Sequence, residues 1–242
     1  MFVSILGDSI STYSGYNPDG YAVFYDEEMQ KRNGLNSVYD TWWAKVNQEL
    51  RAYLCVNNSF SGSRVSGLEF PAGHCQERVM HLRTPEHTPD LILIYLGFND
   101  FGYGVPVSCA PRSNDGKTNL RYFEDAYHRM LTGLRYFYPN TRIICATLMR
   151  TVLEQNKLWQ FPERLGGTGL DAYNDAIRRA ASNCHVWLAD LAKRHLNIAN
   201  LTNCDCRYET LDGAHPTAKG HQTIANEWIA CLSKIEKNHG VW

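Results

Sequence analysis

The sequence has 242 residues, of which 44% are hydrophobic and 12% are aromatic, and its formal net charge is −1. This length and composition predict one α/β domain over residues 1–242 with a sizeable core. Lysine and arginine do not cluster, which excludes a nucleic-acid-binding patch, and no apolar run approaches the roughly 18–20 residues of a membrane span. Met1 leads straight into an apolar run without a basic segment, so we expect a cytoplasmic protein, although a trimmed exported protein has the same pattern. The sequence carries no signal for an oligomeric state.

The eight cysteines do not form a pattern that predicts disulfides or a metal site. A chain of this size needs no disulfide to fold, and Cys55 and Cys145 lie in apolar runs where cysteine packs as a small hydrophobic residue. Cys204 and Cys206 are the only close pair, and no second pair or histidine couple stands at zinc-site spacing. We therefore expect reduced thiols, no structural metal and no cofactor.

Apolar runs and amphipathic stripes alternate along the chain. Continuous apolar or β-branched runs predict strands at 2–6, 54–59, 90–96, 142–148 and 185–188. Apolar residues spaced three or four apart predict helices at 40–51, 73–83, 123–137 and 170–180 and from about 217 onward. Irregular polar and aromatic segments occupy 11–39, 101–119 and 151–169. This alternation predicts a parallel, three-layer α/β/α sandwich with right-handed crossovers.

The first irregular segment directly follows Ser9 and contains several aromatic side chains: Tyr13, Tyr16, Tyr21, Phe24 and Tyr25. Long irregular segments in compact domains often carry function, so one interpretation is that this segment walls a site at Ser9. The other interpretation is a surface loop whose aromatic side chains pack on the body of the domain.

Polar residues and glycine follow three of the predicted strands. Ser9 follows the first strand, Gly62 the second and Asn99 the third. The carboxyl ends of parallel strands meet at one edge of the sheet, where ligands bind in open α/β folds. Near the C-terminus, Asp212 and His215 stand three residues apart in a turn that opens the last helix. Each of these residues alone is ordinary turn or cap chemistry, but together they form a catalytic pattern.

The chemistry of an acyl transfer requires this combination. A serine hydroxyl is a weak nucleophile until a base takes its proton, and His215 is the candidate base for Ser9. Asp212 is positioned to hold the other ring nitrogen and stabilise the imidazolium. The oxyanion that forms needs donors, and the backbone N–H groups of Ser9 and Gly62 with the side-chain amide of Asn99 are the natural three.

These residues stand in four motifs that resemble the SGNH or GDSL hydrolases. The motifs are Gly-Asp-Ser-Ile-Ser at 7–11, the glycine of Ser-Gly-Ser at 61–63, Gly-Phe-Asn-Asp at 97–100 and Asp-Gly-Ala-His-Pro at 212–216. The resemblance implies a flavodoxin-like sheet with strand order 2-1-3-4-5 and ester hydrolysis through an acyl-enzyme. It also implies that the serine sits on a helix-opening turn, which Asp8 braces.

The irregular segments favour a short acyl group as the substrate. They are rich in Tyr, Trp, Asn, Gly and Arg, which suit sugar rings better than long acyl chains, so we expect a short-chain esterase, and a carbohydrate deacetylase in particular. The candidate substrate-binding residues are Arg64, Asp100 and Tyr13, and a surface salt bridge is the other interpretation of Arg64.

Three alternatives carry less support from the sequence. A lysophospholipase or thioesterase uses the same triad, but the sequence offers neither the aliphatic lining nor the amphipathic lid of a lipase-type tunnel. A glycan-binding module has no need of a base aligned on a hydroxyl. A flavin or phosphate binder lacks its motif, since neither a P-loop nor Gly-x-Gly-x-x-Gly follows the first strand.

Overall fold

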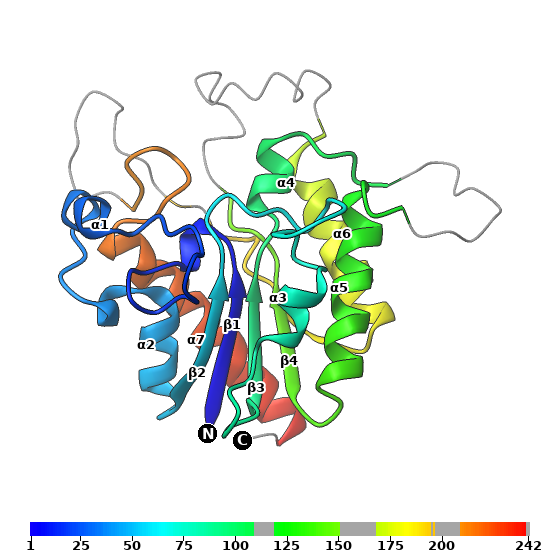
Figure 1. The fold of residues 1–242 in the computed structure, drawn as a ribbon, viewed down its shortest axis with the longest axis horizontal. Helices are drawn as coiled ribbons and strands as arrows, with labels where there is room; N and C mark the ends of the chain where they lie inside the picture. The colour runs from blue at the N-terminus through cyan, green and yellow to red at the C-terminus, as the bar shows by residue number, and fades with distance from the viewer. Residues whose placement is uncertain (109–118, 151–167, 195, 197–208, 241–242) are drawn as a thin grey trace.

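Five parallel strands form one sheet in the order β2-β1-β3-β4-β5. The computed structural model describes residues 1–108, 119–150, 168–194, 196 and 209–240 (Figure 1). The strands are β1 (Phe2–Gly7), β2 (Tyr53–Ser59), β3 (Leu91–Tyr95), β4 (Arg142–Ala146) and β5 (Trp187–Ala189). The α/β class and the strand order implied by the resemblance are therefore confirmed.

Helices cover both faces of this sheet. They are α1 (Glu27–Asn33), α2 (Trp42–Glu49), α3 (Gln76–Met80), α4 (Phe98–Gly102), α5 (Phe123–Phe137), α6 (Leu170–Asn183) and α7 (Ala218–His239), with 3-10 turns η1 (Ser9–Ser11) and η2 (Val38–Asp40). α2 packs against α7, and α5 packs against both α3 and α6. The chain moves from β1 to β2 and then back past β1 to β3. Right-handed crossovers in these opposite directions put α2 and α3 on opposite faces.

The core lies on both faces of the inner strands. All five residues of β3 are buried, as are five of the six in β1, because helices cover both sides of them. β2 is an edge strand, and its first residue, Tyr53, is 71% exposed. On the α2–α7 side, the indole rings of Trp42 and Trp228 stack with centroids 5.4 Å apart. The continuous apolar runs of the inner strands thus match their double-sided burial.

The fold brings three strand ends to one level at its topological switch point. Gly7 at the end of β1 pairs with Ser59 of β2 on one side and with Tyr95 of β3 on the other. The strand arrows in Figure 1 all point to this edge, and α1 and α4 lie beyond it. In open α/β folds, ligands bind where connections leave a strand in opposite directions. Ser9 stands two residues past Gly7, at this edge of the sheet.

The structure corrects three predicted boundaries. The segment 11–39 contains helix α1, which has no apolar stripe because its sequence, EEMQKRN, is polar; Asp26 caps its start and Gly34, in the left-handed region, ends it. The helix predicted at 73–83 covers only α3, since the N–H of Leu82 donates to the Tyr138 hydroxyl instead of continuing the helix. The second irregular segment begins later than predicted, because α4 follows Gly97 at once.

Residues 151–167 of the third irregular segment and the Cys204–Cys206 pair lie outside the described residues.

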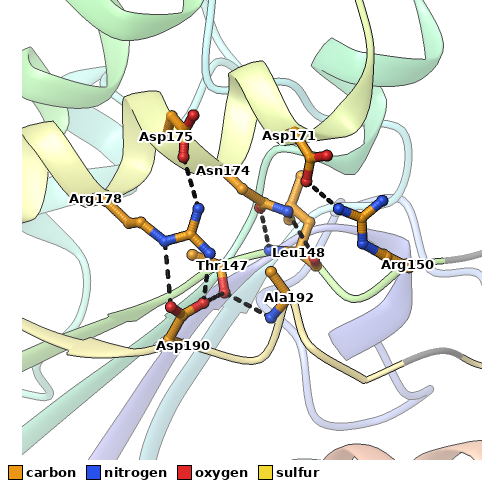
Figure 2. A network of polar contacts seen from close by, with 9 residues as sticks. All are labelled: Thr147, Leu148, Arg150, Asp171, Asn174, Asp175, Arg178, Asp190 and Ala192. Atoms are coloured by element: carbon orange, nitrogen blue, oxygen red, sulfur yellow. Dashed lines mark hydrogen bonds and ion pairs between the residues drawn. The ribbon is translucent and has the colours of Figure 1, made fainter.

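A polar network joins the carboxyl ends of β4 and β5 to α6 (Figure 2). The Asn174 side chain accepts from the Leu148 N–H at 2.7 Å and donates to the Leu148 carbonyl at 3.0 Å. Asp190 accepts from Thr147 and receives two bonds from the Arg178 guanidinium. Arg150 and Asp171 form a further ion pair beside them. The network therefore holds the chain that leaves β4 against the helix that comes after it.

We expect Asn174→Leu to destabilise the protein. Asn174 is fully buried, and its loss leaves the N–H and C=O of buried Leu148 without partners, each at about 1–3 kcal/mol. For a chain of this size, that corresponds to a fall of about 4–24 °C in the melting temperature. Thermal unfolding measures it, with the exposed Asn183→Leu on the same helix as the matched control. Equal melting temperatures for the two variants would contradict the role of this amide.

Candidate active site

Ser9 is held in a tight turn directly after β1. The Asp8 carboxylate caps the turn by accepting from the Ile10 N–H at 3.1 Å. A Cβ on Gly7 would lie 2.5 Å from Ser11 Oγ, so no side chain fits at this position. Ser9 itself is 7% exposed, and it opens η1 as the resemblance implies. The local sequence therefore presents one hydroxyl at the end of the switch-point strand.

The turn before α7 brings His215 to this hydroxyl. His215 Nε2 lies 2.9 Å from Ser9 Oγ, and its Nδ1 lies 2.7 Å from Asp212 Oδ2. The other carboxylate oxygen of Asp212 accepts from the N–H groups of Ala214 and His215, which closes the turn. The three residues predicted as nucleophile, base and orienting acid thus form one hydrogen-bonded chain across 206 positions of sequence.

The environment of Asp212 keeps its carboxyl ionised. Burial acts to raise its pKa, but the hydrogen bond and charge of His215 and the two turn N–H groups outweigh burial and hold the pKa below its ordinary value. An ionised carboxylate can only accept hydrogen bonds, so Nδ1 carries the ring proton when the imidazole is neutral. Nε2 is then the acceptor that faces Ser9.

Gly62 and Asn99 reach the same edge from β2 and β3. Gly62 has φ +78°, a conformation that glycine adopts readily, and Asn99 Nδ2 donates to the Ser63 carbonyl at 2.9 Å. Within the described ranges, the N–H groups of Ser9 and Gly62 donate to no other group. The Asn99 amide has a second N–H that the Ser63 bond does not use. Ser9, Gly62 and Asn99 thus each follow a strand that ends at this edge of the sheet.

Asp100, one of the candidate substrate-binding residues, is held inside the fold. It is fully buried, and its two oxygens accept from the N–H groups of Val65 at 2.7 Å and Ser66 at 2.9 Å. Asp100 therefore fastens the loop that carries Gly62. Tyr13 is also buried, at 7% exposure, and its ring packs edge-on against Tyr16, so it too lies away from an open surface.

Two buried carboxyls beside the site have raised pKa values. Burial raises the pKa of Asp8 and of Asp100 from 3.8 to about 6, against the hydrogen bonds that each accepts. Among the charges that act to lower the pKa of Asp8 is that of Arg78, which is fully buried and donates to the carbonyls of Gly7 and Pro71 and to the side chain of Asn58. Sequence reasoning missed Arg78, because an arginine in a short helix resembles a surface residue.

These carboxyls should make the protein less stable as the pH rises. An unfolded chain releases the Asp100 proton near pH 3.8, whereas the folded chain retains it to about pH 6. The folded state binds more protons in this window, so the free energy of unfolding falls as the pH rises through it and then levels. Inside this window, the free energy of unfolding of the wild type should fall by about 1 kcal/mol per pH unit relative to that of Asp100→Asn. Urea unfolding of both proteins at about pH 4.5 and about pH 7 measures this fall. The same difference in unfolding free energy between wild type and Asp100→Asn at the two pH values would contradict it.

A cavity of about 580 Å³ adjoins the loop that carries Gly62. Its lining includes Gly62, Arg64, Glu69, Phe70 and Tyr103. The exposed Arg64 guanidinium lies 5.4 Å above the Tyr103 ring, within the range of a cation–π contact. Among the described residues Arg64 has no carboxylate partner, so the surface salt bridge considered for it does not form there.

The described ranges contain neither a metal-binding cluster nor a membrane-spanning helix. Histidine, cysteine and acidic side chains do not gather there into a group of three that could hold a metal ion. Within the same ranges, no helix has the length and apolarity needed to cross a membrane. The described cysteines with free thiols are Cys55, Cys75, Cys145, Cys184 and Cys231.

Comparison with known proteins decides the family. Residues 1–157, more than half of the chain, match the model of the GDSL-like lipase/acylhydrolase family. The chain belongs to this family. The match confirms the resemblance drawn from the motifs and makes the protein a member of a hydrolase family. The matched region contains Ser9, Gly62 and Asn99, whereas Asp212 and His215 lie beyond it.

Solved structures share the fold of this GDSL-like chain at low identity. A candidate GDSL-like lipase of Bacteroides ovatus is 24% identical with a TM-score of 0.69, over 96% of this chain and 98% of its own. An acetyl esterase mutant with an acetate ion is 16% identical with a TM-score of 0.54, over 98% of both chains. An acetyl xylan esterase is 14% identical with a TM-score of 0.55, over 96% of this chain and 100% of its own. No curated protein matches the sequence.

Proposed function

We propose that this member of the GDSL-like family is a serine ester hydrolase that forms an acyl-enzyme on Ser9. We further propose that it removes short acyl groups, acetyl above all, from carbohydrate alcohols. The observation that carries the mechanism is the continuous chain of two hydrogen bonds, 2.9 Å from Ser9 Oγ to His215 Nε2 and 2.7 Å from His215 Nδ1 to Asp212. A structural histidine has no need of this alignment on a hydroxyl.

Acylation begins when His215 Nε2 takes the proton of Ser9 as Oγ attacks the ester carbonyl carbon. The carbonyl π pair moves onto oxygen, and the oxyanion accepts from the N–H groups of Ser9 and Gly62 and from the Asn99 amide. Asp212 stabilises the imidazolium. The tetrahedral intermediate then collapses, the C–O bond to the alcohol breaks, and His215 returns its proton to the departing oxygen.

Deacylation repeats these steps with water in place of the serine. His215 takes a proton from a water molecule whose oxygen attacks the acyl carbon, and the same donors hold the second oxyanion. Collapse breaks the bond to Ser9 Oγ, which recovers its proton from the imidazolium. The products are the free acid and the alcohol, and the side chains return to their starting state.

Three observations support a short acyl group on a polar alcohol. Two solved structures with this fold are an acetyl esterase and an acetyl xylan esterase. The cavity beside Gly62 has a mixed lining in which Arg64, Glu69 and Tyr103 stand among apolar residues, so it offers charged and aromatic groups to a polar alcohol. The Arg64 guanidinium, which is exposed at this cavity, is available to a polar substituent of the alcohol.

A series of p-nitrophenyl esters from acetate to palmitate tests the proposal, with Ser9→Ala as the control. We expect the fastest hydrolysis with acetate, a decline with chain length and no turnover in the variant. On acetylated sugars, Arg64→Met should raise KM, whereas its KM for p-nitrophenyl acetate stays unchanged. A preference for long chains would favour a lysophospholipase or thioesterase with the same triad. A wild type that neither hydrolyses esters nor is labelled at Ser9 by a fluorophosphonate would overturn the mechanism in favour of a binding module.

A further inference from the structure

Ser9 and His215 come from opposite ends of the chain, and the segment between η1 and α1 touches both of their turns. Ser9 follows β1, whereas His215 lies in the turn before α7. Their side chains meet through a single hydrogen bond. One bond between two turns does not by itself keep an imidazole aligned, so the contacts made by the intervening segment determine how well the pair is held.

Near Ser9, Thr12 anchors this segment through hydrogen bonds. The Thr12 hydroxyl donates to the Ser9 carbonyl at 2.9 Å and accepts from the Phe24 N–H at 2.9 Å. Thr12 is fully buried, so water does not compete for these bonds. The Ser14 N–H also donates to the Tyr25 carbonyl at 3.1 Å. The backbone at Phe24 is therefore fixed relative to the nucleophile.

On the histidine side, two adjacent aromatic residues hold the base turn. The Phe24 ring stacks on the His215 imidazole, with centroids 3.5 Å apart and the planes inclined by 8°. The Tyr25 hydroxyl donates to the carbonyl of Pro216 at 2.6 Å, and Tyr25 is fully buried. The rings of Phe24 and Tyr25 pack edge to face at 4.9 Å, which couples the two contacts.

The stacked Phe24 ring restrains a rotation of the His215 imidazole that its two hydrogen bonds leave free. Bonds at Nδ1 and Nε2 fix two points in the ring plane, but they leave the imidazole free to tilt about the axis through them. A phenyl ring against one face removes that freedom. Its negative face also attracts the imidazolium that forms when His215 takes the serine proton. A phenyl ring does this without offering a competing hydrogen-bond partner.

We propose that Phe24 and Tyr25 are positioning residues of the catalytic base: Phe24 sets the plane of His215 and stabilises its protonated form, and Tyr25 anchors its turn. The proposal rests on the function proposed above, because it assigns these residues a part in proton transfer. It also gives the first irregular segment a definite role as the bridge between nucleophile and base.

The test compares a variant that removes the aromatic ring with one that keeps it. With p-nitrophenyl acetate, Phe24→Leu should lower kcat about 10-fold while KM stays within about two-fold, since the ring acts on the base rather than on the substrate. Phe24→Tyr, which keeps the ring, should retain most of the wild-type kcat. Tyr25→Phe removes only the hydroxyl and should also lower kcat without changing KM.

The chain offers a matched control at the opposite edge of the sheet. Phe2 stacks on His87 with centroids 4.0 Å apart and planes inclined by 18°, so Phe2→Leu removes the same kind of contact away from the site. Phe2→Leu should leave kcat unchanged. Thermal unfolding of every variant separates loss of fold from loss of alignment, and Phe24→Met applies the same criterion if Phe24→Leu does not fold.

Two results would overturn the inference while leaving the proposed function intact. One is a wild-type kcat in Phe24→Leu. The other is an equal loss in Phe24→Leu and Phe24→Tyr at unchanged melting temperature, which would show that the aromatic ring is not what matters. Failure of the proposed function is distinguishable, because the wild type itself would then lack turnover that depends on Ser9.

Discussion

Ser9→Ala is expected to lower kcat for p-nitrophenyl acetate by about 10⁵- to 10⁶-fold. Without the hydroxyl no acyl-enzyme forms, and only substrate binding and the oxyanion donors remain to assist a direct attack by water. KM should change little, since Ser9 Oγ makes its decisive contact only as the bond to the carbonyl carbon forms. Steady-state kinetics and fluorophosphonate labelling measure the loss.

The same experiment gains power when His215→Ala and the double variant are added. A base and the nucleophile that it activates act as one unit, so the double variant should be no slower than either single variant. His128→Ala, at an exposed position on α5, is the matched histidine control and should keep the wild-type rate. Losses that multiply in the double variant would contradict the proposal that His215 works through Ser9.

Asp212→Asn is expected to cost about 10⁴-fold in kcat with an intact fold. Asp212 Oδ1 accepts from two backbone N–H groups, so the amide oxygen of an asparagine will take that place and its NH₂ will face His215 Nδ1. The imidazole must then accept at Nδ1 and carry its proton on Nε2. This tautomer cannot take the proton of Ser9.

The control for this variant is Asp175→Asn, at an exposed carboxylate on α6 that pairs with Arg178. It should keep the wild-type kcat, because it lies in the network on the far strands of the sheet. The pH–rate profile of Asp212→Asn is the second readout. Activity within about tenfold of the wild type would mean that Asp212 caps the turn without orienting the base.

Local sequence was sufficient for the parts of this protein that depend on local interactions. The apolar runs predict the strands because inner parallel strands are buried on both faces, as β1 and β3 are. The turn motifs predict Ser9 at a strand end because Gly7 has no room for a side chain and Asp8 caps the 3-10 turn that Ser9 opens. The Asp212–His215 bond was predictable for the same reason, since the two residues stand three positions apart in one turn.

The predicted boundaries were wrong where the local sequence pattern carries little signal for an element, or where a tertiary contact competes with it. Helix α1 has no apolar stripe, so its cap and its terminal glycine were the only signals for it. α3 ends early because a tertiary bond from Leu82 to Tyr138 competes with the helix. Asp100 looked like a polar residue beside the site, and only burial and two backbone N–H groups assign its carboxylate to the loop of Gly62.

By itself, the sequence determined the α/β class, the strand ends that carry Ser9, Gly62 and Asn99, and the motifs that indicate the family. Tertiary structure alone decided what surrounds them: a phenyl ring stacked on His215, a buried arginine bonded to Gly7, and the Asp100 carboxylate bonded to the loop of Gly62. The physical reason is the range of the interactions. Periodicity and turn motifs reflect interactions between residues that are a few positions apart. Stacking and burial join residues that are far apart in the chain, so the local sequence pattern does not reveal them.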